Sequence, residues 1–556
     1  MKLHYVAYAK ENVIKAWSEI SHKEKSPITL WRYSSTMLYF NANKYFLINY
    51  HSDWAKEGQP ETTQLSTGKK IIDTKLGTRA AMHAEPFFEL GFDEPAKENE
   101  GKVMLGTIGW PGNFRFTFEV DNVGALRVIP AINPYASDYK LKAGEVFTTP
   151  EFIFAMSDNG MGEASRNLHN WARQYQVNMG MDDRLTLLNN WENTGFDFNQ
   201  QSLAELMKDA KDLGVDMFLL DDGWFGNKYP RNDANAGLGD WQINAKKLPE
   251  GIDYIASHAH RKGLKFGIWI EPEMVNPKSE LAEKHPDWIV SRRPRNAPDA
   301  QPVAAGPDQP QGAGLRILGI RQHDEALAQH RLHQMGRQPP CGERRIGIPA
   351  QRQAVALLDR LCAGILQGHG AHPRQISRRA DPSLRFGRRP RGVRRDEVLQ
   401  RGVDQRQHRS AFARPHPVRH QPVLPGDGHG LARLGHAQPP DQQHHADQIP
   451  LRHGLRGRLG MELQPKQMNA EEKAFARKAI ESYKGYRDIV MEGDLYRIGT
   501  PYDDTGYYGV MYVSKDKKKA VLFTYCTLYQ SRTLVPKYRL YGLDAQTATR
   551  SGAERR

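Results

Sequence analysis

Two adjacent aspartates are the strongest chemical signal in this sequence. Asp221 and Asp222 end the apolar run in VDMFLLDDGW. Two ionised acceptors side by side suit a ligand rich in hydroxyl groups, because charged acceptors strengthen the hydrogen bonds that hydroxyls donate. The structural alternative is that they cap a helix beginning after the strand.

A second pair of carboxylates, Glu271 and Glu273, follows another apolar run in KFGIWIEPEM. On bare chemistry the two would be candidates for acid/base catalysis. Residues two apart share one face only while the strand stays extended, and Pro272 interrupts it. On these residues alone, a catalytic and a structural role both stay open.

Aromatic residues accompany these carboxylates. Trp241, in Gly-Asp-Trp, is a candidate wall against the apolar face of a ligand, and core packing is its alternative. Trp191 and Glu192, in NNWEN, are candidates for a pocket floor, with an inward structural role equally open.

The elements around these residues form a β-α-β-α-β pattern. Strands are expected at LTLLNNW, VDMFLL and KFGIWI, with helices over 201–213 and 252–262 that end at Gly214 and Gly263. Continuous apolar strands separated by helices predict a parallel sheet covered on both faces. In a barrel of this kind, the catalytic side chains gather at the carboxyl ends of the strands. A doubly wound sheet stays open, although no glycine-rich phosphate loop is present.

The preceding region reads differently. Between residues 27 and 151, short strand-like runs such as ITLWRY, YFLINY and FRFTFEV alternate with turn residues, and no long helical pattern intervenes. This is typical of an antiparallel β-sandwich.

Length and composition set further bounds. At about 150 residues per domain, 556 residues predict three or four domains. No apolar run approaches the length of a membrane span. Residues 1–12 show no signal peptide, which favours a cytoplasmic location. The three cysteines form neither a disulfide framework nor a metal-ligand spacing.

The composition breaks sharply between residues 291 and 457. This segment has 28 Arg and 13 acidic residues but no Lys, Trp, Tyr or Thr, so it accounts by itself for the formal charge of +14. It shows no helical or strand periodicity. It is either a basic insert that binds nucleic acid or a stretch read outside its proper frame.

Several long motifs resemble a known family. NNWENTGFDF, FLLDDGWFG, LGDWQINAKKLPEG, FGIWIEPEMVNPKSEL and HPDWIV are similar to the barrel of bacterial glycoside hydrolases of family 36, the α-galactosidases. LRVIPAINPYA resembles the N-terminal sandwich of that family, and LGMELQPKQM and the tail from Glu471 resemble its barrel end and C-terminal sandwich. The resemblance implies an N-terminal β-sandwich over 1–175, a (β/α)8 barrel over 176–475 and a C-terminal antiparallel β-sandwich over 476–556.

The resemblance also implies a chemistry. Family members hydrolyse terminal α-linked galactose with retention, as in melibiose and raffinose, and need no metal or organic cofactor. One aspartate attacks from a Lys-Trp-Asp motif, and a second, in Ser-Asp-Asn, serves as acid and base. Transglycosylation or α-N-acetylgalactosaminidase activity is an alternative within the class. The expected partners are α-galactosides, with neither nucleic acid nor membrane.

On the same resemblance, Asp221 and Asp222 hold the sugar hydroxyls, Trp241 forms a wall, and Trp191 lines the pocket. The loop His51-Ser52-Asp53-Trp54 resembles one that reaches a neighbouring subunit in tetrameric members, which leaves a homo-oligomer open.

Neither catalytic motif is present in the chain as read. Shifting each codon forward by one base forces a Trp from Met335-Gly336 and permits Lys-Trp-Asp, with the aspartate at the codon read as Gly336. The same shift permits Trp-Thr-Ser-Asp-Asn-Thr-Asp over 403–409, with its catalytic aspartate at the codon read as Arg406. We therefore expect 291–457 to be out of frame. An inactive remnant is the main alternative to an active hydrolase, and a nucleic-acid-binding protein is a weaker one.

Overall fold

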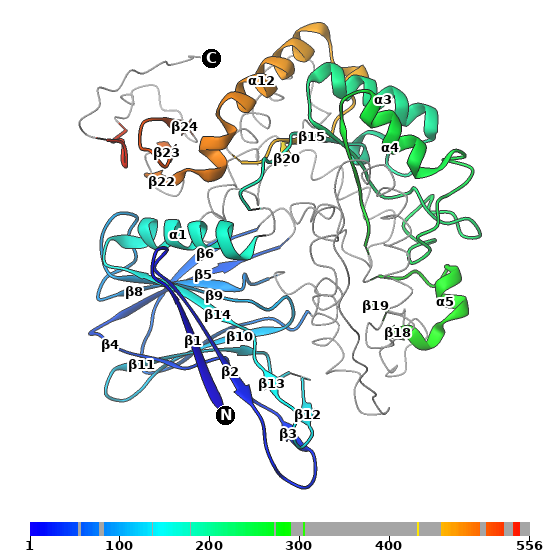
Figure 1. Ribbon diagram of the computed structural model, residues 1–556. Helices are drawn as coiled ribbons and strands as arrows, with labels where there is room; N and C mark the ends of the chain where they lie inside the picture. The colour runs from blue at the N-terminus through cyan, green and yellow to red at the C-terminus, as the bar shows by residue number, and fades with distance from the viewer. Residues whose placement is uncertain are drawn as a thin grey trace, which may run out of the picture.

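The computed structural model describes residues 1–53, 57–76, 83–135, 137–177, 180–271, 274–290, 304–305, 431–432, 457–500, 507–526 and 538–544. They form an N-terminal pair of sheets, a group of parallel strands with flanking helices, and a C-terminal antiparallel sheet (Figure 1). The chain is thus divided into several structural regions.

Antiparallel sheets make up the N-terminal region. The larger one has eight strands in the order β1-β2-β14-β9-β8-β5-β6, with β13 beside β2, and the smaller has four in the order β4-β11-β10-β7. A two-stranded sheet pairs β12 with β3. The bounds are β1 (Lys2–Tyr8), β2 (Val13–Ile20), β3 (Ile28–Leu30), β4 (Leu38–Asn41), β5 (Tyr45–His51), β6 (Gln59–Gln64), β7 (Gly68–Asp73), β8 (Phe87–Phe92), β9 (Val103–Ile108), β10 (Phe114–Val120), β11 (Ala125–Ile132), β12 (Tyr139–Leu141), β13 (Phe147–Thr148) and β14 (Phe152–Ser157).

The two large sheets share one aromatic core. In β10, alternate residues Phe114, Phe116 and Phe118 are fully buried, as the period of a strand requires. Phe88 of β8 meets Phe116 and Phe118 edge-on, with ring centroids 5.2 and 4.7 Å away. The predicted antiparallel strands are confirmed, and the hairpin β1–β2 extends them upstream of residue 27.

The middle of the chain forms five adjacent parallel strands in the order β17-β16-β15-β21-β20. Their bounds are β15 (Leu187–Asn189), β16 (Met217–Leu220), β17 (Lys265–Ile268), β20 (Leu431–Ala432) and β21 (Gly460–Met461). The associated helices are α2 (Trp191–Thr194), α3 (Gln200–Leu213), α4 (Gly251–Arg261), α5 (Glu280–Lys284), η3 (Pro286–Trp288), η5 (Pro465–Gln467) and α12 (Ala470–Glu492). A short antiparallel pair joins β18 (Ile289–Val290) to β19 (Ala304–Ala305). The predicted β-α-β-α-β order is confirmed.

Helix α3 shows how the local sequence sets an element. The Asn199 side chain accepts a hydrogen bond from the Ser202 amide. In return, the Ser202 hydroxyl donates to the Asn199 carbonyl and accepts from the Asn199 amide. The helix ends at Gly214, whose φ of 88° lies in the left-handed region that glycine adopts without strain. Its buried residues repeat at helical spacing and face the strands.

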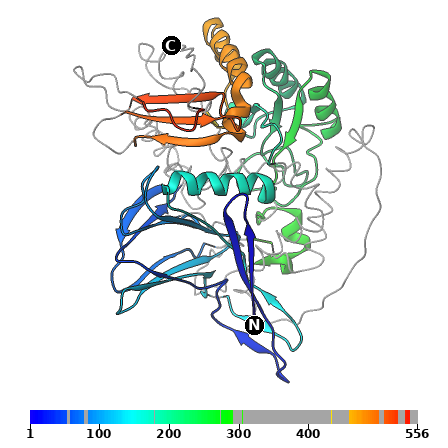
Figure 2. The ribbon, with the colours of Figure 1, turned by 60° about the vertical axis from the view of Figure 1, so that its left-hand side comes forward.

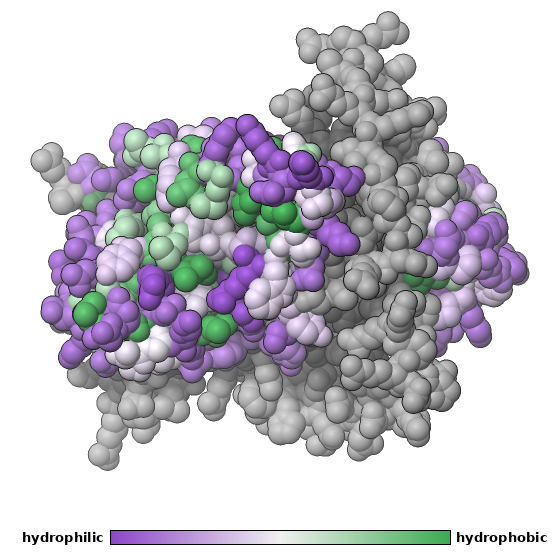
Figure 3. Space-filling view, turned by 90° about the horizontal axis from the view of Figure 1, so that it is seen from below, coloured by the Kyte–Doolittle hydropathy of each residue, from purple (hydrophilic) through white to green (hydrophobic). Residues whose placement is uncertain are grey.

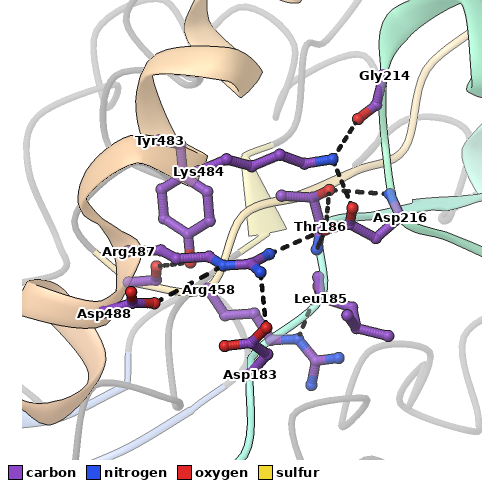
Figure 4. A network of polar contacts seen from close by, with 11 residues as sticks. Asp183, Leu185, Thr186, Gly214, Asp216, Arg458, Tyr483, Lys484, Arg487 and Asp488 are labelled. Carbon is purple, nitrogen blue, oxygen red and sulfur yellow. Dashed lines mark hydrogen bonds and ion pairs between the residues drawn. The ribbon is translucent and has the colours of Figure 1, made fainter.

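Helix α12 is joined to the amino ends of the parallel strands (Figure 4). Asp216 directly precedes β16 and accepts hydrogen bonds from the amide and hydroxyl of Thr186, at 3.1 and 3.0 Å. From α12, Lys484 and Arg487 also bind the Asp216 carboxylate, Arg487 at 3.1 Å. The helix spans the predicted boundary between residues 475 and 476.

The C-terminal sheet lies against the helix that follows the N-terminal sheets (Figure 2). It consists of β22 (Asp494–Ile498), β23 (Tyr507–Val513) and β24 (Ala520–Cys526), all antiparallel. Helix α1 (Gly160–Trp171) continues into the π-helical turn η2 (Ala172–Gln176). Buried Arg497 of β22 binds Glu98, with its Nη1 3.0 Å from Oε2, so the sheet is anchored on the N-terminal region.

The face in Figure 3 mixes hydrophilic residues with smaller groups of hydrophobic ones. Trp31 and Tyr39 are among the exposed large hydrophobic side chains, at 69% and 60% exposure. Single exposed apolar side chains are ordinary on a folded surface. Of the helices described, none combines the length and the apolar character needed to span a membrane.

Candidate active site

The candidate site lies where three parallel strands end. Asp221 and Asp222 follow β16, Asn190 follows the end of β15, and Trp269 follows the end of β17. The registers Asn189↔Leu219 and Leu220↔Ile268 bring these ends to one edge of the sheet. In α/β barrels this carboxyl edge carries the catalytic residues.

Asp221 is a buried carboxylate held by neutral donors. Its side-chain oxygens accept hydrogen bonds from Asn189 Nδ2 at 2.6 Å and from the Asp222 amide at 2.7 Å. Its own amide donates to Asn190 Oδ1 at 2.7 Å. Burial raises the pKa of Asp221 to about 6, against those two hydrogen bonds and with help from the charges of Asp222 and Glu192. Asp221 is therefore ionised at neutral pH and takes up a proton in mild acid.

Asp222 is bound to a cation. Arg231 Nε and Nη2 donate to its two carboxylate oxygens at 2.9 and 2.8 Å, a bidentate pair. Both side chains are almost fully buried, at 10% and 5% exposure. The guanidinium also lies over the rings of Phe196 and Phe225, 5.2 and 5.9 Å from their centroids. The Asp222 carboxylate is thus fixed in orientation.

The helix-cap alternative for this pair is wrong. The chain turns at residues 222–224, and the next helix among the described residues is α4, which begins at Gly251. Glycine is required at this turn, because Gly223 has a φ of 108° and a Cβ there would lie 3.1 Å from the Phe198 ring.

Aromatic rings gather beside the aspartates. Trp241 is half-buried, and its ring centroid lies 4.5 Å from that of Phe225, 6.0 Å from Trp224 and 6.2 Å from Trp269. Phe225 of this cluster also lies against the Arg231 guanidinium that binds Asp222, which connects the rings to the carboxylate pair. An aromatic face beside charged acceptors suits a ligand with both hydroxyls and an apolar side.

Trp191 opens α2 on the neighbouring strand end. Its amide donates to Asn189 Oδ1 at 2.7 Å, and its ring meets Phe196 edge-on at 4.9 Å. Since Asn189 also binds Asp221, Trp191 is connected to the carboxylate pair through one amide side chain. The structure therefore brings all four predicted binding residues to one edge.

Other predicted residues are placed less fully. Glu271 lies past β17 at the same edge, whereas Pro272 and Glu273 lie outside the described residues. The positions read as Gly336 and Arg406 lie outside them as well. Within the described part of the chain, no three His, Cys, Asp or Glu side chains are grouped as a metal would need.

Sequence reasoning missed three residues of this site. Trp269 could have been found, because it directly follows a strand, as Asp221 does. Arg231 could not, because it lies on a loop 9 residues beyond Asp222 without a local pattern. Lys247, 25 residues beyond Asp222, lies within the motif LGDWQINAKKLPEG, but nothing in that motif distinguishes it from Lys246. Lys247 Nζ donates to the carbonyls of Gly223 at 2.8 Å and Arg231 at 3.1 Å, and burial lowers its pKa to about 8.

Comparison with known proteins identifies the family to which this fold and site belong. Parallel strands with carboxylates and aromatic rings at their carboxyl edge define an enzyme-type fold suited to binding a polyol. Three family models match the chain: Glycosyl hydrolase family 36 N-terminal domain over residues 1–142, Melibiase over 146–303, and Glycosyl hydrolase family 36 C-terminal domain over 507–548. The chain belongs to glycosyl hydrolase family 36.

Individual relatives agree with this placement. The chain is 29% identical over 568 residues to alpha-galactosidase AgaA of Geobacillus stearothermophilus, covering 98% of this chain and 74% of that protein. It is 33% identical over 290 residues to alpha-galactosidase 1 of Pediococcus pentosaceus, covering 52% of this chain and only 39% of that protein.

Solved structures are similar over nearly the whole chain. The alpha-galactosidase of Lactobacillus brevis has a TM-score of 0.81 at 25% identity, covering 98% of this chain and 73% of that one. A complex of an AgaA variant of G. stearothermophilus with raffinose has a TM-score of 0.80 at 27% identity, covering 98% and 75%.

Proposed function

We propose that this chain has the fold and the sugar-binding site of an α-galactosidase, which hydrolyses terminal α-linked galactose with retention of configuration. The observation that carries the proposal is the buried Asp221–Asp222 pair at the carboxyl edge of the parallel strands, in a chain of family 36. Relatives named alpha-galactosidase, and related structures with raffinose and stachyose, support oligosaccharides of galactose as substrates.

Each binding residue has a role in this proposal. Asp221 and Asp222 accept hydrogen bonds from sugar hydroxyls, because a desolvated carboxylate is a stronger acceptor than water. Trp241 faces the apolar side of the sugar ring, and Trp191 lines the pocket beside Asn189. The role of Asp221 depends on its charge, so its raised pKa makes binding weaken in mild acid.

We also propose the finer architecture. The five adjacent parallel strands, with α3, α4 and α12 outside them, form one side of a (β/α)8 barrel. The chain divides into an N-terminal sandwich over 1–175, a barrel that begins at residue 176 and includes α12 (Ala470–Glu492), and a C-terminal antiparallel sandwich that begins at β22 (Asp494–Ile498). The aromatic core between the two large sheets and the antiparallel β22–β24 support the two outer domains.

The reaction needs two further carboxylates. In a retaining glycosidase, a nucleophile and an acid/base roughly 5–5.5 Å apart act in turn, through a covalent sugar intermediate. In the shifted frame these are the aspartates of Lys-Trp-Asp and Ser-Asp-Asn. Glycine and arginine cannot replace them, since Gly336 has no nucleophile and the Arg406 guanidinium does not give up its proton at neutral pH.

Resequencing codons 285 to 465 on both strands, followed by expression of both frames, tests this proposal. The restored-frame protein should release galactose from an aryl α-galactoside and from raffinose, whereas the chain as read should release none. The matched control is the restored-frame protein with the Lys-Trp-Asp aspartate changed to asparagine, which should be inactive yet folded. A restored-frame protein without activity would contradict the proposed function, and hydrolysis by the chain as read would show that the two aspartates of the shifted frame are not needed.

A further inference from the structure

Arg231 connects the aspartate pair to the loops around it. The side chain is buried, with 4% exposure, and it uses three nitrogens at once. Besides the bidentate contact with Asp222, its Nη1 donates to the Ala236 carbonyl at 3.1 Å and to Asn276 Oδ1 at 3.0 Å. One guanidinium therefore binds the strand end after β16, the loop beyond it and the segment after β17.

Asn276 completes this connection. Its Oδ1 also accepts from the Leu238 amide at 3.0 Å, and its Nδ2 donates to the Ala234 carbonyl at 3.2 Å. The Asn276 amide donates to the Leu238 carbonyl at 2.8 Å. Because the Arg231 guanidinium and the Leu238 amide donate to the same Asn276 oxygen, both ends of the loop over 231–238 are bound to Asn276.

The same loop leads to Trp241. The Asp240 amide donates to the Gly237 carbonyl at 2.9 Å, and the Asp240 carboxylate accepts from the amides of Glu280 and Leu281 at 2.8 and 2.9 Å. The position of Trp241 is thus determined by a loop whose other end is held by Arg231.

Charge adds a second effect. Asp222 and Glu192 both make it harder for Asp221 to lose its proton, and Arg231 neutralises the nearer of these charges. The charge of Lys247 also interacts with that of Asp222, but its Nζ donates to backbone carbonyls, not to the carboxylate. Without Arg231, Asp222 would be a buried and uncompensated anion beside Asp221.

We propose that Arg231 is a positioning residue of the sugar site, which fixes the Asp222 carboxylate and the loop carrying Trp241 as one unit. This inference rests on the proposed function, since it assigns how that site is preorganised. A preorganised site spares the ligand the cost of ordering loops and side chains when it binds.

The test measures binding of methyl α-D-galactopyranoside to the full chain by calorimetry between pH 5 and 8. This ligand has no titrating group, so any pH dependence belongs to the protein. Arg231→Met should weaken binding at least about tenfold, as expected when a buried charge loses its partner, and should move the acidic limit of binding to higher pH. Arg231→Lys keeps the charge but not the fork, so it should weaken binding while leaving that limit near its parental position.

Arg115→Met is the matched control. Arg115 pairs with Asp73 in the N-terminal sandwich, with its Nη2 2.7 Å from the carboxylate. The Arg115→Met variant should therefore leave both the sugar affinity and the acidic limit of binding unchanged. If Arg231→Met binds the sugar as the parent does, or loses affinity without any change in the acidic limit, the proposal is wrong.

Hydrogen exchange of the 231–238 amides keeps the proposal testable if the parent binds no sugar. The Arg231, Gly237 and Leu238 amides all have acceptors in the structure. Faster exchange there in Arg231→Met and Arg231→Lys, but not in Arg115→Met, would support the positioning role while the proposed function fails. Unchanged exchange would overturn the positioning role itself.

Discussion

The two ends of strand β16 carry aspartates in opposite environments. Asp216, at the amino end, accepts hydrogen bonds from Thr186, Lys484 and Arg487. Burial alone would raise its pKa, but the hydrogen bonds from Lys484 and Thr186 bring it below its ordinary value. Among the described residues, Asp221, at the carboxyl end, is bound by an amide side chain and a backbone amide, and burial raises its pKa to about 6.

This difference separates a structural carboxylate from one available to a ligand. Asp216 has cations as partners, and its ion pairs with them hold α12 to the strands. Asp221 is desolvated and has no cation bound to it in the described part of the chain, an arrangement that costs stability and is found where a group must act on a ligand. Asp216 and Asp221 flank the same strand and carry the same side chain, but they serve two purposes because different groups pack against them.

The largest expected effect is at the amino end. Asp216→Ala should lower the free energy of unfolding by about 2 kcal/mol, because it removes hydrogen bonds between charged groups and leaves Lys484 and Arg487 without this acceptor. Chemical denaturation would measure it, with exposed Asp212→Ala as control. Unfolding like that of the parent would show that the network in Figure 4 does not hold α12.

At the carboxyl end, the expected effect is on the ligand. Asp221→Asn should weaken the binding of methyl α-D-galactopyranoside about tenfold, because an ionised acceptor becomes a neutral one. Calorimetry at pH 7.5 would measure it, and the exposed Asp253→Asn on α4 should bind as the parent does. Equal affinity for parent and Asp221→Asn would remove Asp221 from the sugar site.

The pH dependence of stability should have opposite signs at the two ends. A raised pKa in the folded protein means that the contribution of Asp221 is present below pH 3.8 and is lost as pH rises to about 6. Asp216 has a lowered pKa, so its contribution is present above pH 3.8 and is lost as the pH falls below that value.

Unfolding free energies at pH 3 to 7 would check these signs. Relative to the parent, Asp221→Asn should become more stable as pH rises between about 4 and 6. Asp216→Asn should instead become less stable than the parent as the pH rises towards 3.8, where the parent gains the contribution of the ionised Asp216. Parallel curves for the two variants would mean that the carboxylates do not differ as the structure indicates.

The smallest effect tests whether every polar group at the carboxyl edge serves the ligand. Asn199 caps α3 near this edge, and Asn199→Ala should cost about 1 kcal/mol of stability with no change in sugar affinity. Lys208→Ala, at an exposed position of the same helix, is the control. A loss of affinity in Asn199→Ala would extend the ligand-dependent region to the helix end.

Much of the fold was predictable from local pattern. In sandwich strands such as YFLINY and FRFTFEV, buried side chains mostly alternate with less buried ones, and α3 ends at Gly214 as predicted. The predicted strands were longer than the observed ones: β15 covers only 187–189 of LTLLNNW. Apolar periodicity identifies a strand well, but the ends of its hydrogen-bonded ladder depend on the neighbours it pairs with.

By itself, the sequence determined the family motifs, the order of elements, the aspartate pair after β16 and the anomalous composition of 291–457, because these depend on residue types and short spacings. Only the tertiary structure decided that Asp222 is paired with Arg231, whereas the described groups that bind Asp221 are neutral, and that α12 neutralises Asp216 from about 270 residues further along the chain. Burial and charge partners set the pKa of a carboxylate, and both arise from contacts between segments distant in sequence.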